Sequence, residues 1–171
     1  MDTAGSAASK GLNKKVVDKF GGAITIEEAG GLLGLLVEKR VVRELLLFLK
    51  SYEEAPFVML TDLFGVDRYG QDPRFEVVYL LNSLDMNVRL VVRVRVADGE
   101  SMPTVSDIFG TANWLEREAY DMFGLRFDGH PNLTRILTVD DFDGHPLRKD
   151  FPTEGFGFDK PFVVNLEEET T

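Results

Sequence analysis

The side chains best suited to chemistry are concentrated between residues 114 and 151. Both histidines of the chain lie here, each in a Gly-His-Pro triplet, among carboxylates, arginines and aromatic residues. An acid–base site could be built from Glu116, Glu118, Asp121, His130 and His145. The spacing argues against this, because Glu116 and Glu118 point in different directions on a helix. Arg117 and Arg126 are also near enough in sequence to neutralise the two carboxylates, so independent catalysis is not favoured.

A metal site is the second chemical possibility in this stretch. Imidazole is the commonest protein ligand for metals, and Asp128, Asp141 and Asp143 could complete a site. However, each histidine precedes a proline in a turn, and neither has a second histidine at helical or strand spacing. A structural hydrogen-bonding role for His130 and His145 is therefore the favoured interpretation.

Composition excludes several classes of protein. The 171 residues are enough for one domain with a core, and the formal net charge of −10 argues against nucleic acid as a partner. The chain has no cysteine, so it offers no thiolate for a disulfide, a nucleophile or an iron–sulfur cluster. No apolar run approaches the roughly 20 residues of a membrane span, and no phosphate-binding loop or dinucleotide motif is present. We expect contact with a membrane only through partner subunits.

Hydrophobic periodicity predicts an α+β fold with a mixed, mostly antiparallel sheet, helices packed on it and an extended C-terminal tail. The predicted order is α-β-β-α-β-β-β-α, with disorder over residues 1–9. A competing interpretation makes residues 32–49 one long helix, but Gly34 inside a helix would cost about 1 kcal/mol. The predicted segments are a helix at 10–20, strands at 23–27 and 32–37, a helix up to residue 49, strands at 57–63, 75–81 and 88–96, and a helix at 104–123.

Three of these segments carry further expectations. Thr104 is expected to cap the last helix, with Asp107 completing a shortened capping box. Residues 65–73 are expected to form a polar loop. In the strand at 88–96, valines and leucines alternate with Arg89, Arg93 and Arg95, which form a basic stripe. The stripe is either a solvated strand face or a face turned towards a partner.

The end of the last predicted helix begins a set of motifs. The run EREAYDMFG at 116–124 ends in a glycine that can leave the helix with positive φ. It is followed by GHP at 129–131, TRIL at 134–137 and GHPLRKDFP at 144–152. These motifs, in this order, resemble the signature of the 30 kDa subunit of respiratory complex I, the proton-pumping NADH:quinone oxidoreductase, in which bacteria call it the C subunit. The resemblance is strong over residues 103–153, although Thr134 replaces an arginine that the family often has.

The resemblance implies a non-catalytic structural subunit of the peripheral arm. Such a subunit docks on the 49 kDa subunit, which helps to form the quinone site, and lies near the subunit with the terminal cluster. FMN, iron–sulfur clusters and quinone belong to other subunits, and no cofactor is expected in this chain. The implied location is the cytoplasmic side of the bacterial inner membrane, or the matrix side in mitochondria. The signature residues, which we expect to contact partners, are Glu116, Arg117, Glu118, Tyr120, Asp121, Phe123, Gly124, Gly129, His130, Pro131, Arg135, Gly144, His145, Pro146, Arg148, Lys149 and Asp150.

The residues themselves favour a docking role for the tail. We expect residues 1–125 to form the α+β domain and residues 126–171 to form an extended partner-docking tail. An irregular segment rich in aromatic residues and arginine can lie across a larger partner. It could equally fold back on its own domain, and both can hold for different parts. The aromatic residues and arginines concerned are Phe127, Phe142, Phe151, Phe156, Arg135 and Arg148.

Two other functions remain open at this point. One is the equivalent subunit of a related energy-converting hydrogenase, photosynthetic ferredoxin-dependent complex or F420H2 dehydrogenase, because other subunits select the electron donor. The more distant alternative is a stand-alone small metal-binding enzyme built on the histidine and aspartate turns.

Overall fold

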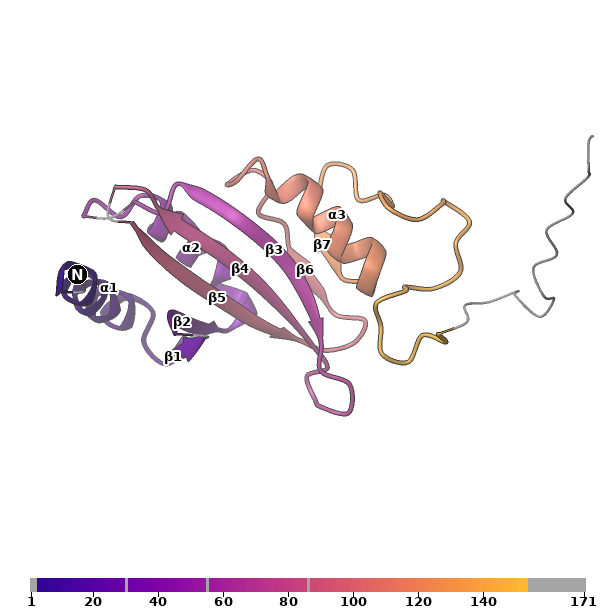
Figure 1. Ribbon diagram of the computed structural model, residues 1–171, viewed down its shortest axis with the longest axis horizontal. Helices are drawn as coiled ribbons and strands as arrows, with labels where there is room; N and C mark the ends of the chain where they lie inside the picture. The colour runs from indigo at the N-terminus through magenta and orange to yellow at the C-terminus, as the bar shows by residue number, and fades with distance from the viewer. Residues whose placement is uncertain (1–2, 30, 55, 86, 154–171) are drawn as a thin grey trace, which may run out of the picture.

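A computed structural model describes residues 3–29, 31–54, 56–85 and 87–153 (Figure 1). Five strands form one sheet in the order β1-β2-β5-β4-β3, and two short strands, β6 and β7, form a second. Two short 3-10 turns cover Gly21–Ala23 and Lys39–Val41. The helices are α1 (Thr3–Phe20), α2 (Val42–Lys50) and α3 (Ala112–Phe123); the strands are β1 (Ile24–Ala29), β2 (Leu32–Val37), β3 (Met59–Asp67), β4 (Phe75–Ser83), β5 (Val88–Val96), β6 (Ser101–Pro103) and β7 (Arg126–Asp128).

The five-stranded sheet is mixed and mostly antiparallel, as predicted. Within it only the pairing of β2 with β5 is parallel. The β1–β2 hairpin turns at Gly31, whose φ of +78° is accessible to glycine at little cost. The strand interpretation of residues 32–37 is therefore confirmed over the long helix. The predicted bounds of β5 are also confirmed, because its alternating valines and arginines fit a strand with one buried face.

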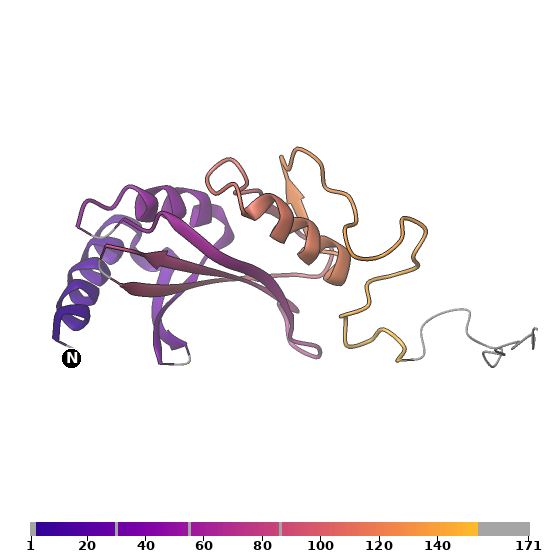
Figure 2. The same ribbon diagram turned by 45° about the horizontal axis from the view of Figure 1, so that its top comes forward.

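One hydrophobic core lies between the sheet and the helices. Helix α2 buries Val42, Leu45, Leu46 and Leu49 against the sheet, and α1 contributes Leu12 and Val16 to the same core. Helix α3 lies over β3, where Gly65 approaches the ring of Phe123. Figure 2 shows α2 and α3 on the same side of the strands. The other side of the sheet is called the open face below.

Two predicted helix starts were wrong. Helix α1 begins at Thr3, within the stretch that was expected to be disordered; this stretch has no proline and is rich in alanine, the strongest helix former. Helix α3 begins at Ala112 instead of residue 104. The residues before it form β6, which pairs in parallel with β7, and the Thr104 amide donates to the Asp128 carbonyl.

Two strand and loop bounds also differ from the prediction. Strand β3 continues to Asp67, so the polar loop before β4 is shorter than expected. Strand β7 covers residues 126–128, so the irregular segment begins after it. No helix or strand is present over residues 129–153, which we call the C-terminal strap. The strap passes α3 and continues beyond the end of the sheet (Figure 1, orange to yellow).

The predicted division at residue 125 stays a prediction, and the part of the tail from residue 154 onwards, including Phe156, lies outside the described residues. Among the residues that are described, no helix is long and apolar enough to cross a membrane.

Candidate functional site

Glu116 is a fully buried acidic group of α3. Its carboxylate accepts hydrogen bonds from the Thr104 hydroxyl at 2.5 Å and from the Val105 amide at 2.7 Å. Burial raises the pKa of Glu116 to about 7, although these two hydrogen bonds oppose the rise. Thr104 is therefore not the helix cap that the sequence predicted. Instead, it ties the segment before α3 to the middle of the helix.

His130 holds the first Gly-His-Pro turn against the start of α3. Its Nε2 lies 3.1 Å from the carbonyl oxygen of Asn113 and 3.9 Å from the Glu116 carboxylate. Its Nδ1 lies 3.0 Å from the Asn132 amide, which donates to it. This pattern fits the tautomer with hydrogen on Nε2. Both ring nitrogens are thus engaged with backbone groups of the chain.

Asp121, on the same helix, organises the middle of the strap. The amides of Ile136, Leu137 and Thr138 donate to one carboxylate oxygen at 2.8–3.0 Å. The other oxygen accepts from the Thr138 hydroxyl at 2.5 Å and from Arg135 at 2.7 Å. Burial alone would raise the pKa of Asp121, but these donors lower it far below its usual range. One side chain thereby satisfies three consecutive backbone amides of an irregular segment.

Two arginines satisfy the carbonyl groups of the strap. Arg135 Nη2 donates to the carbonyl oxygens of Phe142 and Gly144 at 2.9 and 3.0 Å. Arg117 donates to the carbonyl oxygens of Thr134 and Arg135. The expectation that Arg117 neutralises Glu116 was therefore wrong: Arg117 faces the strap, while Glu116 faces the core.

The second Gly-His-Pro turn docks at the end of α3. Gly124 ends the helix with φ of +78°, and the His145 ring lies beside its Cα. His145 Nδ1 lies 2.9 Å from the Asp121 carbonyl oxygen, and the ring meets Tyr120 edge-on at 6.1 Å. The Leu147 amide also donates to the last turn of the helix at 3.0 Å. These contacts fix where the strap leaves α3.

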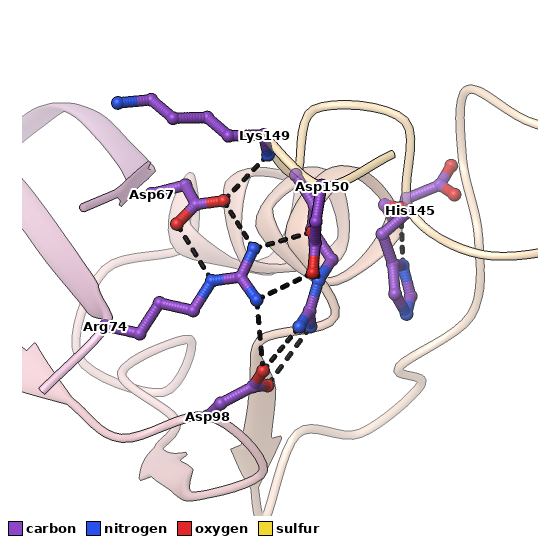
Figure 3. A network of polar contacts seen from close by, with 8 residues as sticks. Asp67, Arg74, Asp98, His145, Lys149 and Asp150 are labelled. Carbon is purple, nitrogen blue, oxygen red and sulfur yellow. Dashed lines mark hydrogen bonds and ion pairs between the residues drawn. The ribbon is translucent and has the colours of Figure 1, made fainter. Parts of the chain in front are cut away.

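Arg74 links the end of the strap to the β3–β4 hairpin (Figure 3). It makes two hydrogen bonds to Asp67, both at 2.8–2.9 Å, and two to Asp150 at 2.6 and 2.9 Å. Asp98 approaches Arg74 at 3.4 Å and pairs with Arg148. We call these five residues the Arg74 cluster. The Arg74 guanidinium lowers the pKa of both Asp67 and Asp150.

Lys149 takes part in this region through its backbone. Its amide donates to Asp67 at 2.8 Å, while its side chain extends away from the cluster (Figure 3). Glu118 and Pro131 are exposed as well. The signature residues are therefore divided among three clusters, around Glu116, Asp121 and Arg74, and are not assembled around a common cavity.

The arrangement is suited to holding the strap in one shape. Its charged groups are paired with each other or with backbone groups of the same chain. Within the described ranges, no group of three or more histidine, cysteine or acidic side chains could hold a metal ion.

Sequence reasoning missed three members of the Arg74 cluster. Asp67, Arg74 and Asp98 lie at or beside strand ends in segments that looked like ordinary polar turns. The available signal was an arginine flanked by carboxylates where strands end. The decisive contact, however, joins Arg74 to a residue 76 positions away.

Comparison with protein families matches residues 35–157 to the family described as "Respiratory-chain NADH dehydrogenase, 30 Kd subunit". The chain belongs to this 30 kDa subunit family. The family match covers the sheet from within β2 and includes all three clusters. The family predicted from the sequence motifs is confirmed.

Individual relatives agree with the 30 kDa family assignment. The chain is 42% identical over 142 residues to the second C subunit of NADH-quinone oxidoreductase from Rhizobium meliloti (strain 1021), covering 82% of this chain and 78% of that protein. A solved fragment of Nqo5 is 34% identical with a TM-score of 0.63, covering 71% of this chain and 98% of the fragment. A chain of an archaeal membrane-bound sulfane sulfur reductase is 26% identical with a TM-score of 0.72, covering 85% of this chain and 86% of its own length.

Proposed function

We propose that this chain is a non-catalytic structural and assembly subunit in the peripheral arm of a proton-translocating NADH:quinone oxidoreductase. In this proposal the C-terminal strap docks on the 49 kDa subunit, near the subunit that carries the terminal cluster. FMN, iron–sulfur clusters and quinone are held by other subunits. The chain then meets the membrane only through its partners, on the cytoplasmic side in bacteria or the matrix side in mitochondria.

The observation that carries the proposal is which side chains of the strap face outwards. The signature side chains around Asp121 and Arg135 bind the strap's own backbone, so they hold its shape. Between them, Leu137, Val139 and Leu147 are 63%, 65% and 54% exposed. Large apolar side chains presented on a segment held by hydrogen bonds are typical of a surface that a partner covers.

Charge indicates what such a partner must offer. Asp140, Asp141 and Asp143 are exposed beside the apolar side chains. Ion pairs of the described residues do not include these three carboxylates. A partner groove with apolar walls and a rim of lysine or arginine would complement both features.

The non-catalytic part of the proposal rests on how the candidate acid–base groups are used. Both ring nitrogens of His130 face backbone partners, and both oxygens of Glu116 accept hydrogen bonds. Asp121 uses its two oxygens for five donors from the strap. These groups serve the fold, which favours a structural role over acid–base catalysis.

The test is to replace the outward apolar pair with Leu137→Asp and Val139→Asp together. We expect a folded isolated chain that no longer enters the complex, measured by the size and NADH:quinone activity of particles solubilised gently from membranes. The matched control is Leu47→Asp, which changes a leucine with 49% exposure on α2. Normal assembly of the double variant would overturn the proposed role of the strap.

A second candidate is the equivalent subunit of a related membrane complex that does not use NADH. It is favoured by the likeness to the archaeal sulfane sulfur reductase chain, because other subunits would select the electron donor. The particle that co-purifies with this chain distinguishes the two. NADH oxidation supports the first proposal, whereas a particle without it that reduces sulfur compounds supports the second.

A further inference from the structure

The open face of the five-stranded sheet carries an apolar stripe of its own. Along β4 and β5, alternate residues belong to the main core, and the residues between them point the other way. Val78 and Val91 lie among the latter and are only 5% exposed. On β3, Phe64 pairs with Val78 and is 38% exposed. The stripe thus continues from the middle of the sheet to its β3 edge.

The described helices do not cover this stripe. Helix α1 meets α2 through the Phe20 and Phe48 rings, and α2 packs on the core side. Helix α3 also contacts the core side, where Gly65 and Phe123 approach each other. Figure 2 shows the strands with helices on one side only. An α+β sheet with an apolar second face is typically covered on that face too.

Arginines flank the stripe in a chain whose net charge is −10. Arg93 pairs with Glu27, and Glu76 lies within 3.1–3.9 Å of Arg68, Arg93 and Arg95. One buried carboxylate is therefore shared by three guanidinium groups. Arg89 is exposed and makes no ion pair with any residue that the structure describes.

A hollow of about 220 Å³ lies beside Arg89 at one end of the stripe. Leu32, Met59 and Leu80 contribute apolar walls, and Arg89 forms part of the rim. The hollow is suited to one large apolar side chain with an acidic group close by.

We propose that the open face docks an amphipathic, acidic helix from a neighbouring subunit. The helix would place an apolar side chain in the hollow and carboxylates against Arg89 and Arg95. A helix is favoured because the opposite face of the same twisted sheet already packs helices. A second copy of the chain is disfavoured, since a symmetric contact would bring the same arginines together. This surface is separate from the strap and goes beyond the proposed function.

The absence of cysteine from the chain allows a direct test by single-cysteine labelling. Phe64→Cys, Val139→Cys and Leu47→Cys place thiols on the open face, the strap and the outside of α2. Each is labelled with a maleimide in the isolated subunit and in the assembled complex. We expect Phe64→Cys to react readily in the isolated subunit and about tenfold more slowly in the complex, as for a site open less than a tenth of the time.

Labelling separates this inference from the proposed function. Equal rates for Phe64→Cys in both forms would overturn the inference, while protection of Val139→Cys would leave the strap proposal standing. Loss of protection at both positions would count against both. A photo-cross-linking residue at position 64 identifies what covers the face. Attachment to an acidic amphipathic segment of another subunit supports the inference; attachment to a second copy or to a basic segment overturns it.

A charge variant tests the same surface without labelling. Arg89→Glu should lower the yield of assembled complex, because a carboxylate then faces the acidic helix. The matched control is Lys14→Glu, which makes the same charge change on the exposed side of α1. Unchanged assembly of Arg89→Glu would overturn the charge pairing.

Discussion

The His145 ring fills the space that a side chain on residue 124 would need. A Cβ atom added to Gly124 would come within 2.7 Å of two ring atoms of His145. Two motifs that are separate in the sequence therefore meet at one point, and the helix must end in a residue without a side chain.

Gly124→Ala tests this contact. The variant must hold a left-handed backbone conformation and also displaces His145, so it should unfold more easily than wild type. Gly70→Ala is the matched control, because Gly70 has φ of +83° but no atom within 4 Å of its added Cβ. In urea unfolding, we expect Gly124→Ala to cost about 1–3 kcal/mol more than the control. Equal costs would show that the ring yields freely.

Asp121→Asn should release the middle of the strap. Asparagine cannot pair with Arg135, and its amide group repels donors that the carboxylate accepts, so a loss of about 3 kcal/mol is expected for a buried charged pair. Hydrogen exchange of the amides at 136–138 measures the release. Unaltered protection of these amides would contradict the role assigned to Asp121.

The same residue predicts an acid response of the strap. Because the folded-state pKa of Asp121 is lowered, its stabilising contribution is present above the unfolded pKa of about 3.9 and is lost as the pH falls towards the folded pKa. Protection of the strap amides in the wild type should therefore decline below about pH 4. The Asp121→Asn variant should show a smaller decline.

Glu116→Gln should change the dependence of stability on pH in the opposite sense. The pKa of Glu116 is raised by burial to about 7, so the folded state binds more protons than the unfolded state from about pH 4.5 to 7. Wild-type stability should fall as the pH rises through this interval, by up to about 3 kcal/mol. Thermal unfolding of Glu116→Gln across the same interval should be flatter. Parallel curves for both proteins would assign the pH dependence elsewhere.

Arg148→Glu should detach the end of the strap and weaken assembly more than it weakens the domain. The new carboxylate would lie beside Asp98 and Asp150, and the reversal at a partly exposed site should cost the domain only about 1 kcal/mol. Limited proteolysis of the strap and the yield of assembled complex measure the effect. Adding Asp98→Arg restores an opposite pair and should recover part of both. Normal assembly, with an unfolded isolated variant, would contradict this prediction.

Local patterns were enough to predict much of the fold. The alternation in residues 88–96 defines β5, and Gly124 ends α3 as its position after an amphipathic run suggested. Local patterns failed where a distant group competes for the same donor. The Thr104 hydroxyl looked like a helix cap, but Glu116 accepts its hydrogen bond from inside the fold.

The candidate site was predictable in its residue types but not in its contacts. The motifs pointed to Asp121, Arg135 and His145, and all three hold the strap. Their targets are backbone groups of an irregular segment, which have no sequence signal. The contribution of Asp67 and Arg74 depends on a tertiary contact with Asp150, which only the folded chain brings within reach.

The spacing of the Arg74 partners has a consequence for the order of assembly during synthesis. Arg74 finds Asp67 only seven residues away, within the β3–β4 hairpin, whereas Asp150 is 76 residues away. The ribosome therefore delivers a hairpin whose buried aspartate already has its countercharge, long before the strap emerges. The newborn domain can wait in a half-fastened form until the last part of the chain closes over it.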